Sequence, residues 1–268
     1  MRPTLRGLVI GVGALVISSL GLQASDWAQN VDTNLSALLG STATVACQPG
    51  MVSVNVGGSL LCVDQYEATA ADRCPVMEPQ SVTDTSINLL ETECRAISVP
   101  DRMPWRFVSL SEAQQLCARN DKRLPTNEEW YRIALTQADN ETCVIEAGAA
   151  VPTGVVECRT ESGVHDLVGN VWEWVDGAVT DGRYAGRPLP PSGYVTVVDN
   201  DGVVLETEQE PRALYGADYA WTSEMGTFGI IRGGYFESGD DAGLYAQNLS
   251  VPFDLRTKGV GFRCVHDR

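Results

Sequence analysis

The first apolar segment of the chain, from Leu8 to Leu22, follows a short stretch that carries two arginines and no acid. The segment has about 15 residues, fewer than the roughly 20 that a helix needs to span a bilayer. The small residue Ala24 follows two positions later, at a plausible cleavage position. This pattern predicts a secretory signal peptide over residues 1–24. An uncleaved membrane anchor is the alternative, because Leu22 is not an ideal residue so close to a cleavage site.

Residues 25–44 have a mixed composition and are interpreted as a spacer. From residue 45 onward the pattern changes to short β-type runs, such as Met51–Val56 and Leu60–Tyr66, separated by glycines. No internal repeat and no linker divides the rest of the chain. We therefore expect a single irregular α+β domain over residues 45–268.

Two helices are predicted by capping boxes, in which a Ser or Thr is followed three residues later by Glu. One box begins at Ser109 and opens a helix that runs to about Arg119. The second begins at Thr126 and opens a helix to about Thr136, with Trp130 and Ile133 on one face. Both helices are expected to pack against the core.

A β-hairpin is predicted where Tyr194–Val198 and Val203–Glu206 flank the acidic turn 199–202. The turn sequence Asp-Asn-Asp-Gly resembles part of a Ca²⁺ loop. The third ligand and the twelfth-position Glu of an EF-hand are missing, however. The segment is therefore interpreted as a turn.

Composition restricts the function. The 268 residues contain 19 Lys and Arg against 35 Asp and Glu, which gives a formal net charge of −16. Such a chain lacks the basic surface that nucleic acid requires. The two histidines, His165 and His266, are too few for a three-histidine metal site. Ca²⁺ bound by carboxylates remains compatible with the composition.

The eight cysteines form an even set in a chain that is expected to be exported, so disulfides are the first interpretation. No Cys-x-x-Cys pair occurs, which disfavours zinc-ribbon and thioredoxin-type sites. Buried free thiols are the alternative. Eight cysteines allow about 105 pairings, so the connectivity needs other information.

Three stretches in this order resemble the formylglycine-generating enzyme (sulfatase-modifying factor) domain family. They are Lys122–Trp130 (KRLPTNEEW), His165–Trp174 (HDLVGNVWEW), and Ile231–Gly234 (IRGG) with Gly261–Cys264 (GFRC). The resemblance covers roughly Val45 to Val265. It implies an irregular, disulfide-stabilised fold related to C-type lectins.

The resemblance also gives the cysteines a partial order. Cys117 and Cys264 stand at positions that form a disulfide in family members. Cys143 and Cys158 enclose a short loop and are expected to pair with each other. The other four can pair in three ways, of which we favour Cys74 with Cys94 and Cys47 with Cys62.

Segment 166–174 of this chain is similar to a Ca²⁺ loop found in the family. The matching ligands are the side chains of Asp166 and Glu173 and the carbonyls of Gly169 and Val171. Hard oxygen ligands of this kind suit Ca²⁺, so we expect a structural Ca²⁺ ion. The alternative is a core segment in which the tryptophans are buried and Glu173 pairs with an arginine.

The family's copper enzymes use two cysteines upstream of the Gly-Phe-Arg-Cys motif. Here the matching stretch, residues 233–261, contains no cysteine. Because thiolates are the ligands that select Cu(I), bound copper and the oxidation of cysteine to formylglycine are not expected. The iron-dependent relatives need histidines that this chain lacks.

The same stretch is similar to the variable C-terminal region of proteins targeted by diversity-generating retroelements, which present a binding face on this fold. Aromatic and charged side chains in it suit recognition. The candidate ligand-binding residues are Tyr235, Phe236, Glu237, Asp240, Asp241, Tyr245, Gln247, Val251, Phe253, Asp254, Arg256 and Lys258. An ordinary surface loop is the alternative.

The sequence therefore predicts an exported, non-catalytic binding protein that presents its C-terminal segment to a protein or glycan at the cell surface. It predicts no nucleic-acid partner, and membrane association only if the N-terminal segment stays uncleaved. Two other functions remain open: an oxidoreductase of the family with altered metal chemistry, and a structural protein of the cell envelope.

Overall fold

The computed structural model describes residues 46–136 and 143–268. The expected signal peptide, residues 1–24, and the expected spacer, residues 25–44, lie outside the described residues. The chain from Cys47 to Arg268 forms one compact unit. No helix of the described residues is long and apolar enough to cross a membrane.

Both predicted capping boxes are present and open helices. Ser109 caps α3 (Leu110–Ala118) and Thr126 caps α4 (Asn127–Ala134), and in each case the Glu side chain at the third helical position bonds back to the capping residue. Trp130, Ile133 and Ala134 form the buried face of α4, as their spacing predicts. A third helix, α2 (Val82–Leu90), begins at Ser81 and is not predicted by the sequence pattern.

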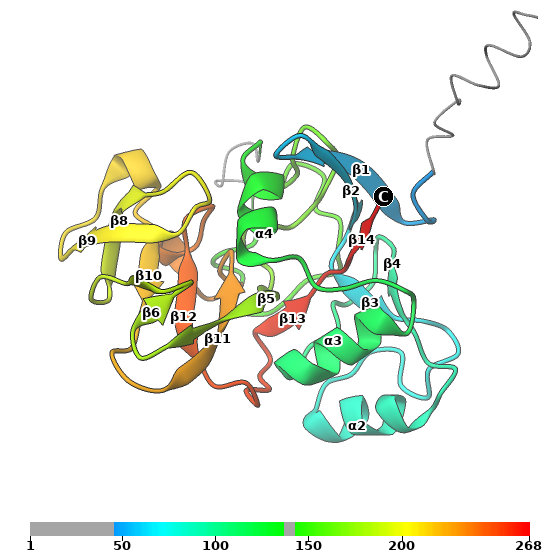
Figure 1. The fold of residues 1–268 in the computed structure, drawn as a ribbon. Helices are drawn as coiled ribbons and strands as arrows, with labels where there is room; N and C mark the ends of the chain where they lie inside the picture. Colours follow the sequence, from blue (N-terminus) through cyan, green and yellow to red (C-terminus); the bar gives the residue numbers. More distant parts are fainter. Residues whose placement is uncertain (1–45, 137–142) are drawn as a thin grey trace, which may run out of the picture. The chain divides into compact units, whose positions relative to one another are not determined.

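The strands of the described residues form three sheets (Figure 1). One sheet pairs β1 (Met51–Val56), β2 (Ser59–Asp64) and β14 (Val265–Asp267), and another pairs β3 (Ala68–Ala70) with β4 (Ala96–Ser98). The largest sheet has the order β7-β6-β5-β11-β12-β10-β8-β9, and β13 also pairs with β5. Its strands are β5 (Trp172–Thr180), β6 (Arg183–Tyr184), β7 (Arg187–Pro188), β8 (Gly193–Val198), β9 (Val204–Glu208), β10 (Tyr219–Trp221), β11 (Thr227–Arg232), β12 (Gln247–Val251) and β13 (Val260–Phe262). The mixed, irregular α+β class is confirmed.

Four disulfides join the eight cysteines in the expected pairs: Cys47–Cys62, Cys74–Cys94, Cys117–Cys264 and Cys143–Cys158. The Cys117–Cys264 bond links α3 to the segment between β13 and β14, across a sequence separation of 147 residues. Removing a native disulfide commonly destabilises a small domain by about 2–5 kcal/mol. The cysteines therefore contribute to stability.

The acidic segment 199–202 is a turn, and it is held against α4. Asp199 Oδ1 accepts hydrogen bonds from the backbone N–H groups of Asp201 and Val203, and Arg132 on α4 forms an ion pair with Asp201. Gly202 has a φ of +72°, and a Cβ atom there would lie 2.1 Å from the ring of Tyr131. Only glycine fits this close contact between the hairpin and the helix.

The centre of the domain contains a fully buried ion pair between Glu173 on β5 and Arg263 after β13. Arg263 Nη2 lies 2.6 Å from Glu173 Oε1, and both side chains have no exposed surface. Glu173 Oε2 also accepts a 2.7 Å hydrogen bond from Trp130 Nε1. Arg263 donates further to the carbonyl oxygens of His165 and Asp64. The three sequence motifs therefore meet at one buried pair.

A second buried pair reinforces the same junction. Lys122 Nζ lies 2.7 Å from Asp64 Oδ1, and Asp64 Oδ2 accepts a hydrogen bond from the backbone N–H of Cys264. Glu67 is buried nearby, where it accepts hydrogen bonds from Asn170 Nδ2 and from the backbone N–H of Val171. Burial, together with the charges of Asp166 and Glu173, raises the pKa of Glu67 well above its usual value. Arg263 is thus the cation that balances a carboxylate-rich interior.

Replacement of Glu173 by Gln is expected to lower the free energy of unfolding by about 3–5 kcal/mol, because it leaves the Arg263 charge buried without its partner. The measurement is denaturant unfolding. The matched control is Glu208→Gln, which breaks an ion pair with Arg212 whose side chains are 46% and 55% exposed and should change stability by less than about 1 kcal/mol. Equal effects of the two substitutions would contradict the central role of the buried pair.

Asp218, just before β10, is a buried carboxylate with an unusual proton affinity. Its Oδ2 accepts a 2.6 Å hydrogen bond from the backbone N–H of Tyr245, whereas Oδ1 has no hydrogen-bond partner among the described residues. Burial raises the pKa of Asp218 to about 7, against 3.8 for a free aspartate. The folded state therefore binds a proton between these two pH values that the unfolded state has released.

Stability is accordingly expected to fall as pH rises from about 4 to 7, by roughly 3–4 kcal/mol for the Asp218 contribution. The substitution Asp218→Asn keeps an acceptor for the Tyr245 N–H and cannot ionise, so it should remove this part of the slope. Unfolding free energies of both proteins across this pH range provide the measurement. Parallel curves for the two proteins would show that Asp218 does not titrate as described.

Candidate ligand-binding surface

The structure divides the twelve candidate ligand-binding residues between the core and the surface. Phe236, Gln247 and Val251 are 1%, 0% and 2% exposed, so they cannot contact a ligand in this arrangement. Gln247 bonds instead to the backbone of Gly202 and Tyr245. For Gln247 and Val251 the reason is strand alternation, since every second residue of β12 points into the core, whereas Phe236 packs in a separate cluster with Ala150 and Val171. For these three residues the sequence expectation is corrected.

Tyr235, Glu237 and Lys258 lie together at the surface. Lys258 Nζ is 2.7 Å from Glu237 Oε1 and 5.2 Å from the centre of the buried Phe236 ring. Burial, together with the negative charge of Glu237, raises the pKa of Tyr235. These three residues place a phenol, a carboxylate and an ammonium group beside one another, which suits recognition of a polar ligand.

The other candidates lie in separate places. Asp240 lines a shallow hollow beside the segment 143–147, and Asp241 is its neighbour in the short helix η3 (Gly239–Asp241). Phe253, Asp254 and Arg256 border the start of α3, where Arg256 forms an ion pair with Glu112.

Tyr245 lies apart from the group of Tyr235, Glu237 and Lys258 and from the candidates near η3 and α3. Its ring contacts Tyr131 and Tyr215, the latter in the short helix η2 (Ala213–Tyr215). The twelve residues therefore do not form one continuous surface.

A row of aromatic rings crosses the outward face of the large sheet, and we call it the aromatic strip. It consists of Tyr194 on β8, Tyr219 and Trp221 on β10, and Trp172 at the start of β5. Successive ring centres are 5.2, 4.7 and 5.7 Å apart, in tilted or edge-to-face arrangements. Such contacts stabilise the rings as a group. Tyr194, Tyr219 and Trp221 are each partly exposed.

Strand alternation explains why Tyr194, Tyr219 and Trp221 face outward, whereas Trp172 is 7% exposed and belongs to the core. Ala220, between Tyr219 and Trp221, is fully buried, and Val195, next to Tyr194, is 1% exposed. Tyr194 and Tyr219 are directly paired across β8 and β10, and Trp221 is paired with Asn248 on β12. Asn248 is partly exposed, as is Ser250 two residues later. The strip is therefore bordered by an amide and a hydroxyl.

The aromatic strip is continuous with the C-terminal candidates. The backbone N–H of Trp172 donates to the carbonyl of Gly259, and the ring of Tyr235 covers Gly259, where a Cβ atom would lie 2.5 Å from Tyr235 Cδ2. Trp221, Tyr235 and Leu255 all pack against the core cluster that contains Trp172. The candidate surface thus combines the aromatic strip with Tyr235, Glu237 and Lys258.

Sequence reasoning missed the strip because its residues come from three separate strands. The local signal is the pattern Tyr219-Ala220-Trp221, in which large aromatic residues alternate with a small one. That pattern is typical of a strand with one outward aromatic face. It does not show that Tyr194 and Trp172 extend the row.

The expected Ca²⁺ ligands have other partners. Asp166 accepts hydrogen bonds from the backbone N–H groups of Gly154 and Val155, and burial raises its pKa to about 6. Both oxygens of Glu173 are bonded to Arg263. Among residues 46–136 and 143–268, no group of three or more His, Cys, Asp or Glu side chains could hold a metal ion.

These contacts do not fit the expected Ca²⁺ loop, because the guanidinium of Arg263 takes the place beside Glu173 that a cation would need. The backbone N–H of Val171 donates to Glu67, and that of Gly169 donates to the carbonyl of Gly233. Segment 166–174 therefore has the contacts of the alternative interpretation, a core segment whose glutamate pairs with an arginine. We derive no chemistry from a metal at this position.

The cysteines offer no copper site of the kind that the family uses. All eight are in disulfides, and the stretch 233–261 contains none. A disulfide sulfur cannot act as the thiolate ligand that Cu(I) requires. The residues present therefore do not fit the copper site of the family's oxidases.

Comparisons with known proteins give a family but no close relative. Residues 136–268 match the family model described as "Sulfatase-modifying factor enzyme 1-like domain", which includes the second and third motifs and lies beyond the first. No curated protein matches the sequence.

Three solved structures illustrate the structural likenesses. The Major Tropism Determinant U1 variant has 16% identity and a TM-score of 0.43, over 83% of this chain and 54% of that one. For Treponema denticola variable protein 1 the values are 12%, 0.44, 82% and 100%, and for PvdO from Pseudomonas aeruginosa 14%, 0.45, 81% and 90%. The chain thus spans about half the length of the Major Tropism Determinant variant. With TM-scores below 0.5, nothing about function follows from these likenesses.

The family match and the convergence of the motifs on the Glu173–Arg263 pair agree with each other. Residues 136–268 therefore match the model of the sulfatase-modifying factor enzyme 1-like domain, as the resemblance of the motifs predicts.

Proposed function

We propose that this protein is an exported, non-catalytic binding protein whose ligand contacts the aromatic strip and the adjoining residues Tyr235, Glu237 and Lys258. The observation that carries the proposal is the set of three partly exposed aromatic rings, Tyr194, Tyr219 and Trp221, on the large sheet. Large aromatic side chains lose little conformational entropy on binding, and they are enriched where proteins make energetically important contacts.

The chemistry of the surface favours a ligand with flat apolar faces and polar edges. The rings offer apolar area, while Asn248, Ser250, Glu237 and Lys258 offer hydrogen-bond donors and acceptors at the border. A glycan fits this description, since a sugar ring has one apolar face and a rim of hydroxyl groups. An exposed protein loop with an aromatic residue is the alternative ligand of the same surface.

Two observations favour binding over the family's oxidase chemistry. No thiolate is available for copper, as all the cysteines are paired. The aromatic strip also contains no nucleophile with an adjacent base, the arrangement that covalent catalysis needs. Four disulfides suit an oxidising compartment, which supports export of the protein.

The binding proposal predicts that the labelled protein recognises a subset of an oligosaccharide array, and that Trp221→Ala and Tyr219→Ala each weaken this binding by about tenfold or more. Quenching of tryptophan fluorescence by the bound sugar provides a second measurement.

The control for this experiment is Tyr66→Ala, which removes a partly exposed ring that stacks on His165 away from the strip. Sugar binding that survives both strip substitutions would place the site elsewhere. If the array shows no binding at all, the glycan interpretation is wrong and a protein ligand is left.

The non-catalytic proposal predicts no aldehyde formation when the protein is incubated with a Cys-x-Pro-x-Arg peptide, copper and oxygen. The physical reason is the lack of a thiolate pair to hold Cu(I). Mass spectrometry of the peptide provides the measurement, and a family member that has the cysteine pair serves as the positive control. Conversion at an enzymatic rate would establish an oxidase with different ligands.

A further inference from the structure

The side chain of Asn248 lies on the outward face of β12, beside the aromatic strip. Its neighbours in the strand, Gln247 and Leu249, are fully buried, whereas Asn248 is partly exposed. Asn248 is directly paired with Trp221 on β10, and these two strands are parallel. Directly paired residues of neighbouring strands have their side chains on the same face of the sheet. The amide group of Asn248 therefore adjoins the ring of Trp221.

Two hydrogen bonds fix the orientation of this amide group. The backbone nitrogen of Ser250 lies 3.1 Å from Asn248 Oδ1, and the Ser250 hydroxyl oxygen lies 3.0 Å from the same atom. A backbone N–H can only donate, so the atom that it contacts is the oxygen of the amide and not the nitrogen. The hydroxyl donates to the same oxygen, whose two lone pairs are then both used. Only the Nδ2 group of Asn248 is left for a ligand.

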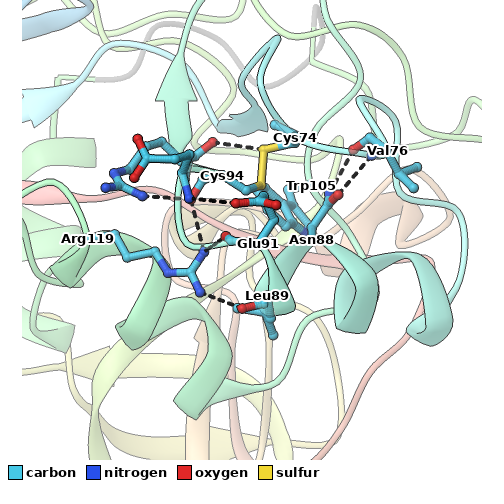
Figure 2. The surroundings of a disulfide bond; sticks show 12 residues. Cys74, Val76, Asn88, Leu89, Glu91, Cys94, Trp105 and Arg119 are labelled. Carbon is cyan, nitrogen blue, oxygen red and sulfur yellow. Dashed lines mark hydrogen bonds between the residues drawn. A yellow bond between two sulfur atoms is a disulfide. The ribbon is translucent and has the colours of Figure 1, made fainter.

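Asn88, in the interior of the domain, shows an amide group that is used at both ends. Its Oδ1 accepts a hydrogen bond from the backbone N–H of Val76, and its Nδ2 donates to the carbonyl of the same residue (Figure 2). Asn248 Nδ2, in contrast, donates to no acceptor among residues 46–136 and 143–268, and it is open to solvent. Within the same residues, Trp221 Nε1 also has no acceptor. The surface at Trp221 thus presents two N–H groups without acceptors.

Groups that only donate favour a ligand atom that only accepts. Neither Asn248 Nδ2 nor the indole N–H of Trp221 can accept a hydrogen bond. A carbonyl oxygen can bond to such a donor with nothing left unpaired, whereas a sugar hydroxyl carries a proton that needs an acceptor of its own. A carboxylate is also a pure acceptor, but it would approach a chain whose formal net charge is −16. A neutral carbonyl is therefore the ligand group that fits best beside Trp221.

We propose that the ligand of the aromatic strip is a glycan with an acetamido group, whose carbonyl oxygen accepts a hydrogen bond from Asn248 Nδ2 and whose methyl group packs against Trp221. This inference rests on the function proposed for the strip and names the chemical class of its ligand. An acetamido group combines a neutral acceptor with a small apolar group, and the surface here combines a donor with an apolar ring. Asn248 then determines specificity, and Ser250 positions its amide group.

The test compares two neutral trisaccharides on the purified protein. Chitotriose is a trimer of N-acetylglucosamine, and cellotriose is the trimer of glucose with the same linkage, so each acetamido group of the first is a hydroxyl group in the second. Isothermal titration calorimetry should show that chitotriose binds at least about tenfold more tightly. This comparison uses the unaltered protein, so it does not depend on the folding of a variant.

The substitution Asn248→Asp removes the donor and keeps an acceptor for the backbone N–H of Ser250. It should weaken chitotriose binding by about tenfold, to the level of cellotriose, and change cellotriose binding by less than about threefold. The matched control is Asn55→Asp. Asn55 Oδ1 likewise accepts from a nearby backbone N–H, that of Gly58, but Asn55 lies on β1 in a different sheet. This control should keep the full preference for chitotriose.

The possible outcomes separate this inference from the proposed function. Equal binding of the two trimers that is lost in Trp221→Ala would overturn the inference and leave the strip as a binding site. A preference for chitotriose that persists in Asn248→Asp, while circular dichroism shows a folded protein, would overturn it as well. Binding of neither trimer would overturn the inference and leave a protein ligand for the strip.

Discussion

The buried pair of Glu173 and Arg263 is the interaction on which the rest of the domain depends. It lies where the sheet of β1, β2 and β14 meets α4 and the large sheet. It also contacts all three of the sequence motifs. A buried ion pair is not in itself a strong source of stability, because desolvation offsets most of the attraction. Its importance here is geometric. Both charges are satisfied only when Trp130, His165 and Arg263 take their native positions, so the pair specifies how the segments assemble.

The buried Glu173–Arg263 pair changes how the three sequence motifs are interpreted. The segment 166–174 is similar to a Ca²⁺ loop in the family, and here both oxygens of its glutamate are bonded to an arginine. The cysteines likewise have a structural role. They stabilise the chain as four disulfides, and none is left to bind copper. Residues that could suggest an enzyme from the sequence alone therefore form part of the framework.

How far the sequence predicts this structure depends on whether a feature is local. The capping boxes at Ser109 and Thr126 are complete within four residues, so both helices are predicted almost to the residue. Helix α2 was missed because Thr85 and Asn88 are buried while Leu90 is exposed, which removes the periodic apolar face that identifies a helix.

The candidate site is the part that the sequence predicts least well. The aromatic strip joins residues 172, 194, 219 and 221, and only the pairing of strands brings them together. Of the C-terminal candidates, Phe236, Gln247 and Val251 are buried. Their residue types alone do not show which way the side chains point, so the sequence does not predict this burial. The sequence offers the pairing of Glu173 with an arginine as an alternative, but it does not identify Arg263 as the partner, since the two residues are 90 positions apart.

The aromatic strip shows how this division of roles works along a strand. On β10 and β12 the outward residues Tyr219, Trp221 and Asn248 alternate with Ala220, Gln247 and Leu249, which are buried. The buried set is fixed by the core, whereas the outward set combines recognition with packing, because Trp221 also packs against the core cluster that contains Trp172. The buried ion pair and the four disulfides do not involve these outward residues, so the framework can carry different recognition chemistry on the same strands.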